Sequence, residues 1–588
     1  MSKTNLSAGP KAAKSRIPVP ENGLQYNFCK NPKCANYGVA PTSLAPKGLY
    51  ALAYGGKGMP LLKCNACGEN PPFKSNAGIR EEMQRISAYL HITTPESTTT
   101  CTNSDCQNHS IPVTTPKAYR SFGKAASDAK RYQCSICHKT VSVPLPTQWQ
   151  RDTHQNIQIF KCLVNKVPLS RIVEMLDISW AVLYNRIDFI HCQCLAFVAD
   201  RERRLKTLHI RRVYLAIDRQ DYEVNWTERK DKRNIVLSAM TSADNRTGYV
   251  FGAHPNFDYT LDKLAIENDA KEINDAANAA PFKKYARLWL ESDYIEAINN
   301  KKLKKFVYTA SLNDSIAQKY KEVIEREDVE AFDEKTIEEK LPNYGLQIRA
   351  EYTMIAHFYF LKKLLSNVEK WRFFLDQESG IRSACLSAFQ EEVSQKRAEA
   401  FYVRIEKELT VDEKRRLNAA AKKRFSALKA NYPDLTDTQI KLELLKQEIQ
   451  STTALGHWKD KWVKHPIPDM SEANKAMCWL TEHDEFDMDH KAFLYNKASL
   501  HSVDSFFEKV RRRVYMLERS IHSSSSAGRT WSGYAAYNPA MVVKLMEIFR
   551  VVHNYIDSRK IDGIASTPAM RLGLAKAKLD YGYILYFK

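Results

Sequence analysis

The chain has 588 residues, of which 44% are hydrophobic and 27% charged, a composition typical of globular proteins. It contains no run of about 18 apolar residues, which excludes a helical membrane span, and no apolar segment typical of a secretory signal. The net charge of +20 is uneven: residues 1–210 hold 27 Lys and Arg against 13 Asp and Glu, and the rest holds 61 against 55. The basic front third favours nucleic acid as a partner. The alternative is a basic protein with no such partner.

After a loose basic arm at 1–24, eight of the thirteen cysteines form two similar clusters. The flanking residues agree as well: CKNPKCAN corresponds to CTNSDCQN, and KCNACG to QCSICH. This pattern predicts one unit that occurs twice, at 25–95 and 96–148. In a cytoplasmic chain, four thiolates in two short turns favour a structural zinc ion, so we expect two zinc ribbons. The expected zinc ligands are Cys29, Cys34, Cys64 and Cys67, and Cys101, Cys106, Cys134 and Cys137.

Zinc ribbons bind DNA in some proteins and dock other proteins elsewhere. Lys130 and Arg131 lie just before the last pair of cysteines. We expect them to face DNA phosphates. The alternative to zinc is eight reduced cysteines in small apolar cores.

Residues 149–208 predict a helix-turn-helix domain followed by a linker. Pro168 ends the first helix, a second helix follows, and Ser179 caps a third. Trp180, Ala181, Tyr184, Asn185 and Arg186 are expected to face outward on the third helix. Of these, Tyr184, Asn185 and Arg186 are predicted to contact DNA in the major groove. A plain helical hairpin is the alternative.

Beyond residue 209, apolar runs at 212–218, 234–240 and 248–254 predict an antiparallel three-stranded meander. Another predicted strand ends at Asp376. Asp218 and Asp376 each end an apolar strand, where a charge is costly. If these strands are neighbours, the two carboxylates share one site that suits Mg²⁺. Each Asp could equally cap a turn, and Glu518 on a predicted helix is by itself unremarkable.

The order of these elements resembles insertion-sequence transposases of the DDE class. RYQCSICHKTVSV is similar to their zinc knuckle, and LSRIVEMLDISWAVLYNRI to their helix-turn-helix. VYLAID and FFLDQESGIR are similar to the two Asp strands, and LERSIHSSSSAGRTWSGYAAYNP to the Glu helix and the segment after it. The resemblance implies an α/β multidomain chain with an RNase H-like catalytic core at 209–588. It also implies that Asp218, Asp376 and Glu518 are the catalytic triad.

The intervals of 158 and 142 residues between triad members require large helical insertions, expected at about 275–345 and 390–500. The resemblance implies a DNA transposase that binds element ends and cleaves and joins strands with two Mg²⁺ ions. Its partners would be double-stranded DNA, at element ends and target, and further copies of the chain. Its location would be the bacterial cytoplasm, at the nucleoid.

Arg512 and Arg519 are expected to contact the DNA backbone, although surface ion pairs are the alternative for both. Two other functions stay open for the chain as a whole. One is a non-catalytic DNA-binding regulator on a transposase scaffold. The other is an RNase H-like nuclease without strand transfer.

Overall fold

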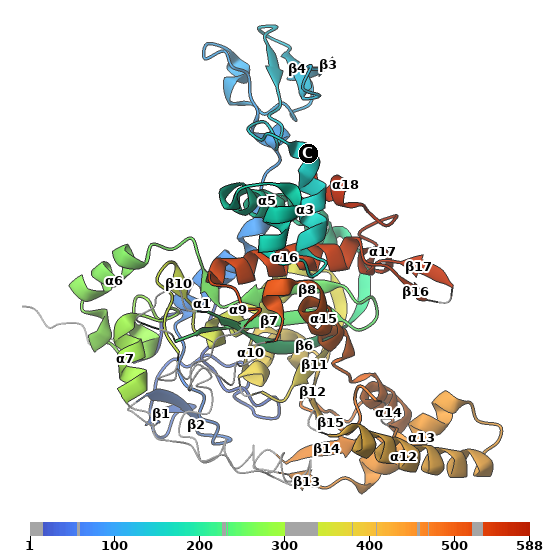
Figure 1. Ribbon diagram of the computed structural model, residues 1–588. Coiled ribbons are helices and arrows are strands. Elements are labelled where there is room, and N and C mark those ends of the chain that lie inside the picture. Colours follow the sequence, from blue (N-terminus) through green and yellow to red (C-terminus); the bar gives the residue numbers. More distant parts are fainter. Residues whose placement is uncertain are drawn as a thin grey trace, which may run out of the picture.

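The computed structural model of the chain describes residues 16–587 except 56–58, 226–230, 232, 300–338, 379, 407–408, 456–458, 468–469, 520–532 and 562. It is an α/β multidomain structure built around a mixed sheet of eight strands, in the order β13-β14-β15-β12-β11-β6-β7-β8 (Figure 1). No helix in these described ranges is long and apolar enough to cross a membrane.

The centre of the sheet combines an antiparallel meander with two parallel strands. The predicted meander is confirmed as β6 (Ile210–Val224), β7 (Ile235–Asp244) and β8 (Val250–Pro255). On the other side of β6, β11 (Val368–Asp376) and β12 (Ala398–Ile405) run parallel to it. Leu215, Phe251 and Phe373 on these strands are fully buried. This burial explains why the central strands form continuous apolar runs in the sequence.

The predicted helical insertion at 390–500 is only partly helical. Its first segment, AEAFYVRI, is β12, whose aromatic and β-branched residues are buried in the sheet. The prediction of a charged helix there is wrong, because the buried Glu399 accepts a hydrogen bond from Trp479 (2.9 Å) within the sheet. The later elements are α12 (Val411–Asn431), α13 (Asp437–Ser451), β13 (Ala454–Leu455), β14 (Asp460–Lys464), β15 (Lys475–Trp479) and α14 (Met488–Lys497).

Helices cover both faces of the sheet. On one face, α9 (Ala350–Leu364) packs Phe358 against Phe373 of β11, with 6.1 Å between ring centroids. On the other face, α15 (His501–Arg513) contacts β6 and β7. Helix α16 (Pro539–Tyr555) contacts β8 and the long helix α5 (Trp180–Arg203), and so joins the sheet to the three-helix segment of 156–203.

The remaining elements surround this body. The predicted insertion at 275–345 is described only at its ends, including α7 (Glu291–Asn299), because 300–338 lie outside the described residues. Residues 16–24 of the expected arm contact α1 (Asn76–Ser87): the Asn76 amide donates to Val19 O (2.9 Å). The three-helix segment contains α3 (Asn156–Leu163), α4 (Leu169–Leu176) and α5, at the predicted positions.

Candidate metal centres and the sheet carboxylates

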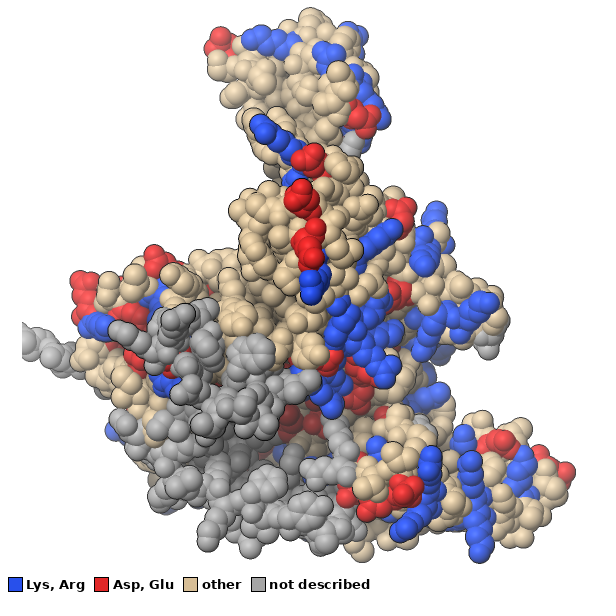
Figure 2. All heavy atoms as spheres, viewed as in Figure 1, with Lys and Arg blue, Asp and Glu red and all other residues tan. Residues whose placement is uncertain are grey.

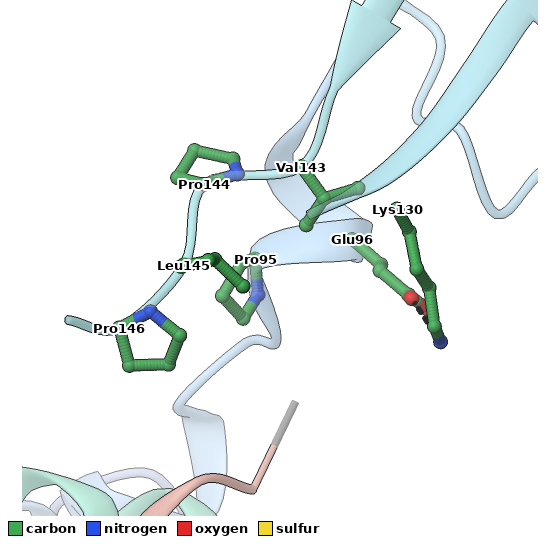
Figure 3. Close-up of a pocket in the computed structure, with 7 residues that line it drawn as sticks. All are labelled: Pro95, Glu96, Lys130, Val143, Pro144, Leu145 and Pro146. Carbon is green, nitrogen blue, oxygen red and sulfur yellow. Dashed lines mark hydrogen bonds and ion pairs between the residues drawn. The ribbon is translucent and has the colours of Figure 1, made fainter. Parts of the chain in front are cut away.

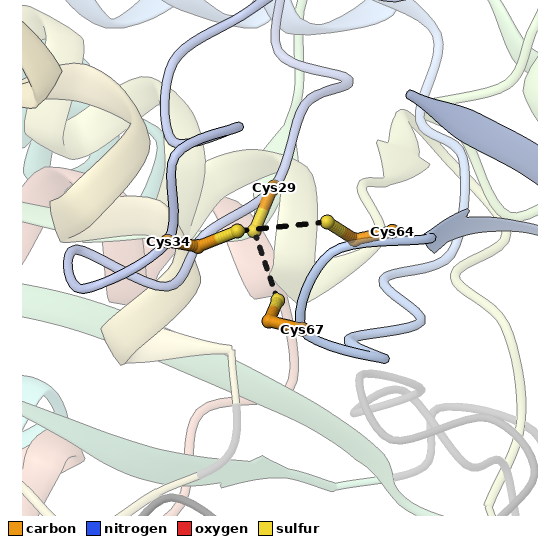
Figure 4. Close-up of side chains that lie close together, drawn as sticks. All are labelled: Cys29, Cys34, Cys64 and Cys67. Carbon is orange, nitrogen blue, oxygen red and sulfur yellow. Dashed lines mark hydrogen bonds between the residues drawn. The ribbon is translucent and has the colours of Figure 1, made fainter. Parts of the chain in front are cut away.

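Two groups of four cysteines converge, as the duplicated pattern predicted. In each group the four sulfur atoms all lie within 4.8 Å of one another. Sγ–Sγ distances are 3.5 Å for Cys29–Cys67 and 3.7 Å for Cys34–Cys64 (Figure 4). The corresponding pairs in the second group are 3.4 and 3.6 Å apart. A zinc ion with Zn–S bonds of about 2.3 Å requires S–S edges of about 3.8 Å in a tetrahedron. Both tetrads could therefore bind zinc.

The two tetrads share a set of supporting hydrogen bonds that extends the repeat beyond the cysteines. Asn36 Nδ2 donates to Cys64 Sγ, and Asn108 Nδ2 to Cys134 Sγ, each at 3.3 Å. The Tyr50 hydroxyl donates to Asn36 O and accepts from Cys29 N, and Tyr119 makes the same contacts with Asn108 and Cys101.

Sequence reasoning missed these four supporting residues. Asn36 and Asn108 stand at corresponding positions in CKNPKCAN and CTNSDCQN, and that correspondence was the available signal. Such contacts orient metal ligands and hold their charge.

The same hydrogen bonds favour thiolate at one ligand of each tetrad. Burial opposes ionisation of Cys134, but the N–H groups of Cys137 and Ile136 and the Asn108 amide outweigh it and lower its pKa to about 6. The pKa of Cys64 is lowered by matching donors, again against burial. Burial raises the pKa of Cys67 and of Cys101 to about 12. A bound cation would stabilise all four thiolates.

The first cysteine unit (residues 25–95) is docked on the sheet body. The Tyr37 hydroxyl donates to Leu386 O (2.7 Å), and Lys74 pairs with Glu351 (2.9 Å). Ile79 and Ile86 of α1 belong to the main hydrophobic core. This unit is therefore a built-in part of the body, and its second knuckle leads directly into a buried helix.

The second cysteine unit (residues 96–148) stands apart, beyond α3 and α5 (Figure 1). Its strands are β3 (Tyr119–Lys124), β4 (Lys130–Cys134) and β5 (Thr140–Ser142). They pack on a separate small cluster of valines that shares no member with the main core in the described part of the chain. A small hollow marks its base, where the chain enters and leaves (Figure 3). The hollow is lined by Pro95, Glu96, Lys130, Val143, Pro144, Leu145 and Pro146.

The predicted phosphate contacts of this unit lie on β4. Lys130 forms an ion pair with Glu96 (2.6 Å), which holds the lysine over the hollow. Arg131 lies over the Phe122 ring, 5.4 Å from its centroid. Both side chains have partners within the unit.

The three-helix segment presents one exposed aromatic face. Trp180 and Tyr184 are exposed on α5 and stack with 6.2 Å between ring centroids, and Asn185 is exposed beside them. The prediction that Arg186 faces outward is wrong. Arg186 is buried because its guanidinium donates to the carbonyl of Arg151, in the segment that precedes α3.

Asp218 and Asp376 lie side by side on the two central parallel strands. Leu375 of β11 pairs with Ile217 of β6, so one register step further brings Asp376 next to Asp218. Paired residues on neighbouring strands point to the same face. The expectation that the two carboxylates are neighbours is therefore met.

Asp218 does not end its strand, as expected from the sequence, because β6 continues to Val224. Its side chain is only 4% exposed, and its Oδ1 accepts from Arg219 N (2.7 Å). By strand alternation Tyr222 shares its face. Burial raises the pKa of Tyr222 and Arg511 of α15 lowers it, which places the end of α15 over this face.

Glu518 is close to this region but lies outside the helix expected to carry it. Helix α15 ends at Arg513, and Glu518 follows the short turn of helix at Tyr515–Leu517 in extended backbone. Its carboxylate forms an ion pair with Lys166, from the turn between α3 and α4. Burial opposes ionisation of Glu518, but the Lys166 contact outweighs it, so its pKa is lowered.

The structure does not gather the three carboxylates into one cluster. Among the described residues, the only groups of three or more potential metal ligands within 4.8 Å of one another are the two cysteine tetrads. Lys166 also donates to Arg511 O and, through its backbone, to Arg513 O, both at 2.7 Å. The turn of the three-helix segment thus holds the chain that carries Glu518.

The two arginines expected to contact DNA lie on the same side. Arg512 is 76% exposed and pairs with Glu508 of its own helix (2.8 Å). Arg519 is exposed directly after Glu518. Comparison of the chain with protein-family models and with curated proteins finds no match.

Proposed function

We propose that the chain is a DNA transposase that binds element-end DNA and cleaves and transfers its strands. The observation that carries the proposal is the pairing of Asp218 with Asp376 on the central parallel strands. The strand order β8-β7-β6-β11-β12, three antiparallel strands followed by two parallel ones, supports an RNase H-like core.

The donor set fits divalent cations. Two carboxylates on adjacent strands, one of them buried, repel each other unless a cation lies between them. Asp218, Asp376 and Glu518 would hold Mg²⁺, which prefers carboxylate oxygens. When bound, Mg²⁺ stabilises charge on the phosphodiester and activates the attacking hydroxyl or water.

The protein's own groups bind and orient the DNA. Trp180, Tyr184 and Asn185 of α5 face solvent as a recognition helix would, with α3 and α4 bracing it. The second cysteine unit extends from this segment and would lengthen the DNA footprint. Two copies of the chain would be needed, because two element ends must be joined.

One observation favours a second candidate, a non-catalytic DNA-binding regulator. Glu518 is paired with Lys166, and the three carboxylates form no cluster in the described residues. A regulator would keep the recognition helix and the tetrads while its carboxylates hold no Mg²⁺.

The test compares Asp218→Asn with Asp221→Asn. Asp221 lies three residues on, points to the other face of β6 by alternation, and accepts from Ser238 Oγ (2.6 Å). The substrate is DNA carrying the sequences that flank the chain's own gene, with Mg²⁺. We expect strand cleavage by Asp218→Asn to fall by orders of magnitude with DNA binding retained, and Asp221→Asn to cleave normally. A wild-type chain that binds this DNA without cutting it would favour the regulator.

A further inference from the structure

The hairpin β16 (Arg559–Ile561) and β17 (Ile564–Ser566) projects from the sheet body as a separate two-stranded ribbon (Figure 1). Lys560 pairs with Ala565 across the ribbon, and Ile561 with Ile564 next to the turn. Ile564 is 71% exposed, although an isolated apolar side chain gains nothing from water there. The ribbon therefore has a polar, basic strand and an apolar tip.

Positive charge gathers where the ribbon meets α15. Lys509 of α15, Arg559 and Lys560 form no ion pair with any residue in the described ranges, and we call these three residues the basic ribbon surface. Arg571, of α17 (Pro568–Leu572), donates to the carbonyls of Thr247 and Ser566. Figure 2 shows Lys and Arg atoms gathered over this side of the molecule.

These cations repel one another in the folded chain. Burial lowers the pKa of Lys509, and Arg559, Arg513 and Arg571 lower it further, while Asp557 acts in the opposite direction. The Asp557 carboxylate is already bound by Arg513, at 2.5 and 2.6 Å. A cluster of like charges destabilises the compact state unless an anion offsets it. The neutralising anion is therefore expected from outside the described chain.

We propose that the basic ribbon surface binds the backbone of a DNA duplex, with the β16–β17 tip in a groove. A two-stranded ribbon fits the major groove, and an exposed apolar side chain at its tip is suited to contact bases. The surface continues along α15 toward Arg512, Glu518 and the face of Asp218. It is distinct from the α5 face, so it would hold the DNA that is being cut or joined. The inference rests on the proposed DNA-binding function and adds a second duplex contact to it.

The test uses the full-length chain and a blunt duplex of arbitrary sequence, titrated at two salt concentrations. Arg559→Ala/Lys560→Ala is compared with Lys422→Ala/Lys423→Ala, which removes the same charge from exposed positions on α12. Each lost phosphate contact makes the slope of log affinity against log salt shallower by about 0.9. We expect a change of about 1.8 for the ribbon variant and none for the α12 variant.

Each other outcome overturns a defined part of the proposal. If the wild-type chain binds the duplex and the ribbon variant binds it equally well, or if both variants weaken equally, the ribbon assignment is wrong and the proposed function stands. If the loss appears only with single-stranded DNA, the duplex assignment is wrong. If the wild-type chain binds no DNA, both the inference and the proposed function fail.

A second measurement is independent of affinity. Ile564→Cys carrying a photoreactive thiol label should crosslink to the duplex, whereas Tyr432→Cys, exposed after α12, should not. The wild-type chain treated in the same way gives the background from its own cysteines. Crosslinking no greater at Ile564→Cys than at Tyr432→Cys would contradict the placement of the ribbon in a groove.

Discussion

Loss of zinc from the two tetrads should have opposite consequences for the body of the protein. Cys67 and Cys137 occupy corresponding places in the repeat, each as the last ligand of its tetrad. Cys67→Ser removes one thiolate from the docked first unit, and Cys137→Ser removes one from the second unit, which stands apart. The sequence alone predicts that Cys67→Ser leaves the rest of the chain folded. The docking of the first unit reverses that expectation.

The magnitude can be worked out from the side chains that the first unit buries. Tyr26, Phe28, Ile79 and Ile86 all belong to the main hydrophobic core. Burying each such side chain contributes about 1.5–3 kcal/mol, so the four together contribute about 6–12 kcal/mol. A typical domain has a total unfolding free energy of about 5–15 kcal/mol. If the first unit unfolds without its metal, the sheet body should lose most of its stability.

The assay is zinc content by elemental analysis together with calorimetric unfolding. The wild-type chain should carry two zinc ions and each variant one. Cys67→Ser should lower the main unfolding transition markedly, while Cys137→Ser should leave it in place and remove only a small separate transition. Cys192→Ser, at an exposed cysteine outside both tetrads, is the control. The reasoning is refuted if Cys67→Ser loses its zinc and the main transition stays where it was.

Two further predictions concern contacts of the three-helix segment. Asn185→Ala should weaken binding to element-end DNA by about 1–3 kcal/mol and leave random DNA unaffected, whereas Arg186→Ala should chiefly lower thermal stability, because Arg186 braces the segment before α3; equal losses on both DNAs for Asn185→Ala would contradict base recognition. Lys166→Met should raise the pKa of Glu518 and tighten Mn²⁺ binding in a calorimetric titration, whereas Lys161→Met, on α3, should do neither; because the ion pair lowers the pKa of Glu518, its contribution to stability is present at neutral pH and is lost as the pH falls through that lowered value.

Periodicity predicted the central strands and the three helices because their apolar faces are local patterns. It placed the end of β6 too early, because RQDYEV continues the strand with alternating burial and looks polar in sequence. It missed β12 for a related reason. The buried Glu399 lies 3.7 Å from Arg372 and 3.1 Å from His483, partners that are 27 and 84 residues away in sequence.

The unequal roles of the two cysteine units could not be predicted from their shared ligands. The difference lies in the segment after the last cysteine of each unit. After Cys67 the chain enters α1, whose Ile79 and Ile86 are buried in the main core, whereas after Cys137 it forms β5 and leaves through Pro144 and Pro146. Arg186 illustrates the same limit at one residue. Its helical position predicts exposure, and a carbonyl 35 residues earlier in the chain buries it.

The position of Glu518 links DNA recognition to the carboxylates of the sheet. Lys166 and Glu518 are 31% and 26% exposed, and ion pairs with such exposure contribute about 0–1 kcal/mol. A divalent cation or a DNA phosphate can therefore displace either partner at little cost. The backbone contacts are firmer, because Lys166 N donates to Arg513 O and the Arg513 guanidinium donates to Val164 O (3.0 Å). A movement of the α3–α4 turn on DNA must then carry the end of α15 with it, while the Glu518 carboxylate is free to turn toward Asp218 and Asp376.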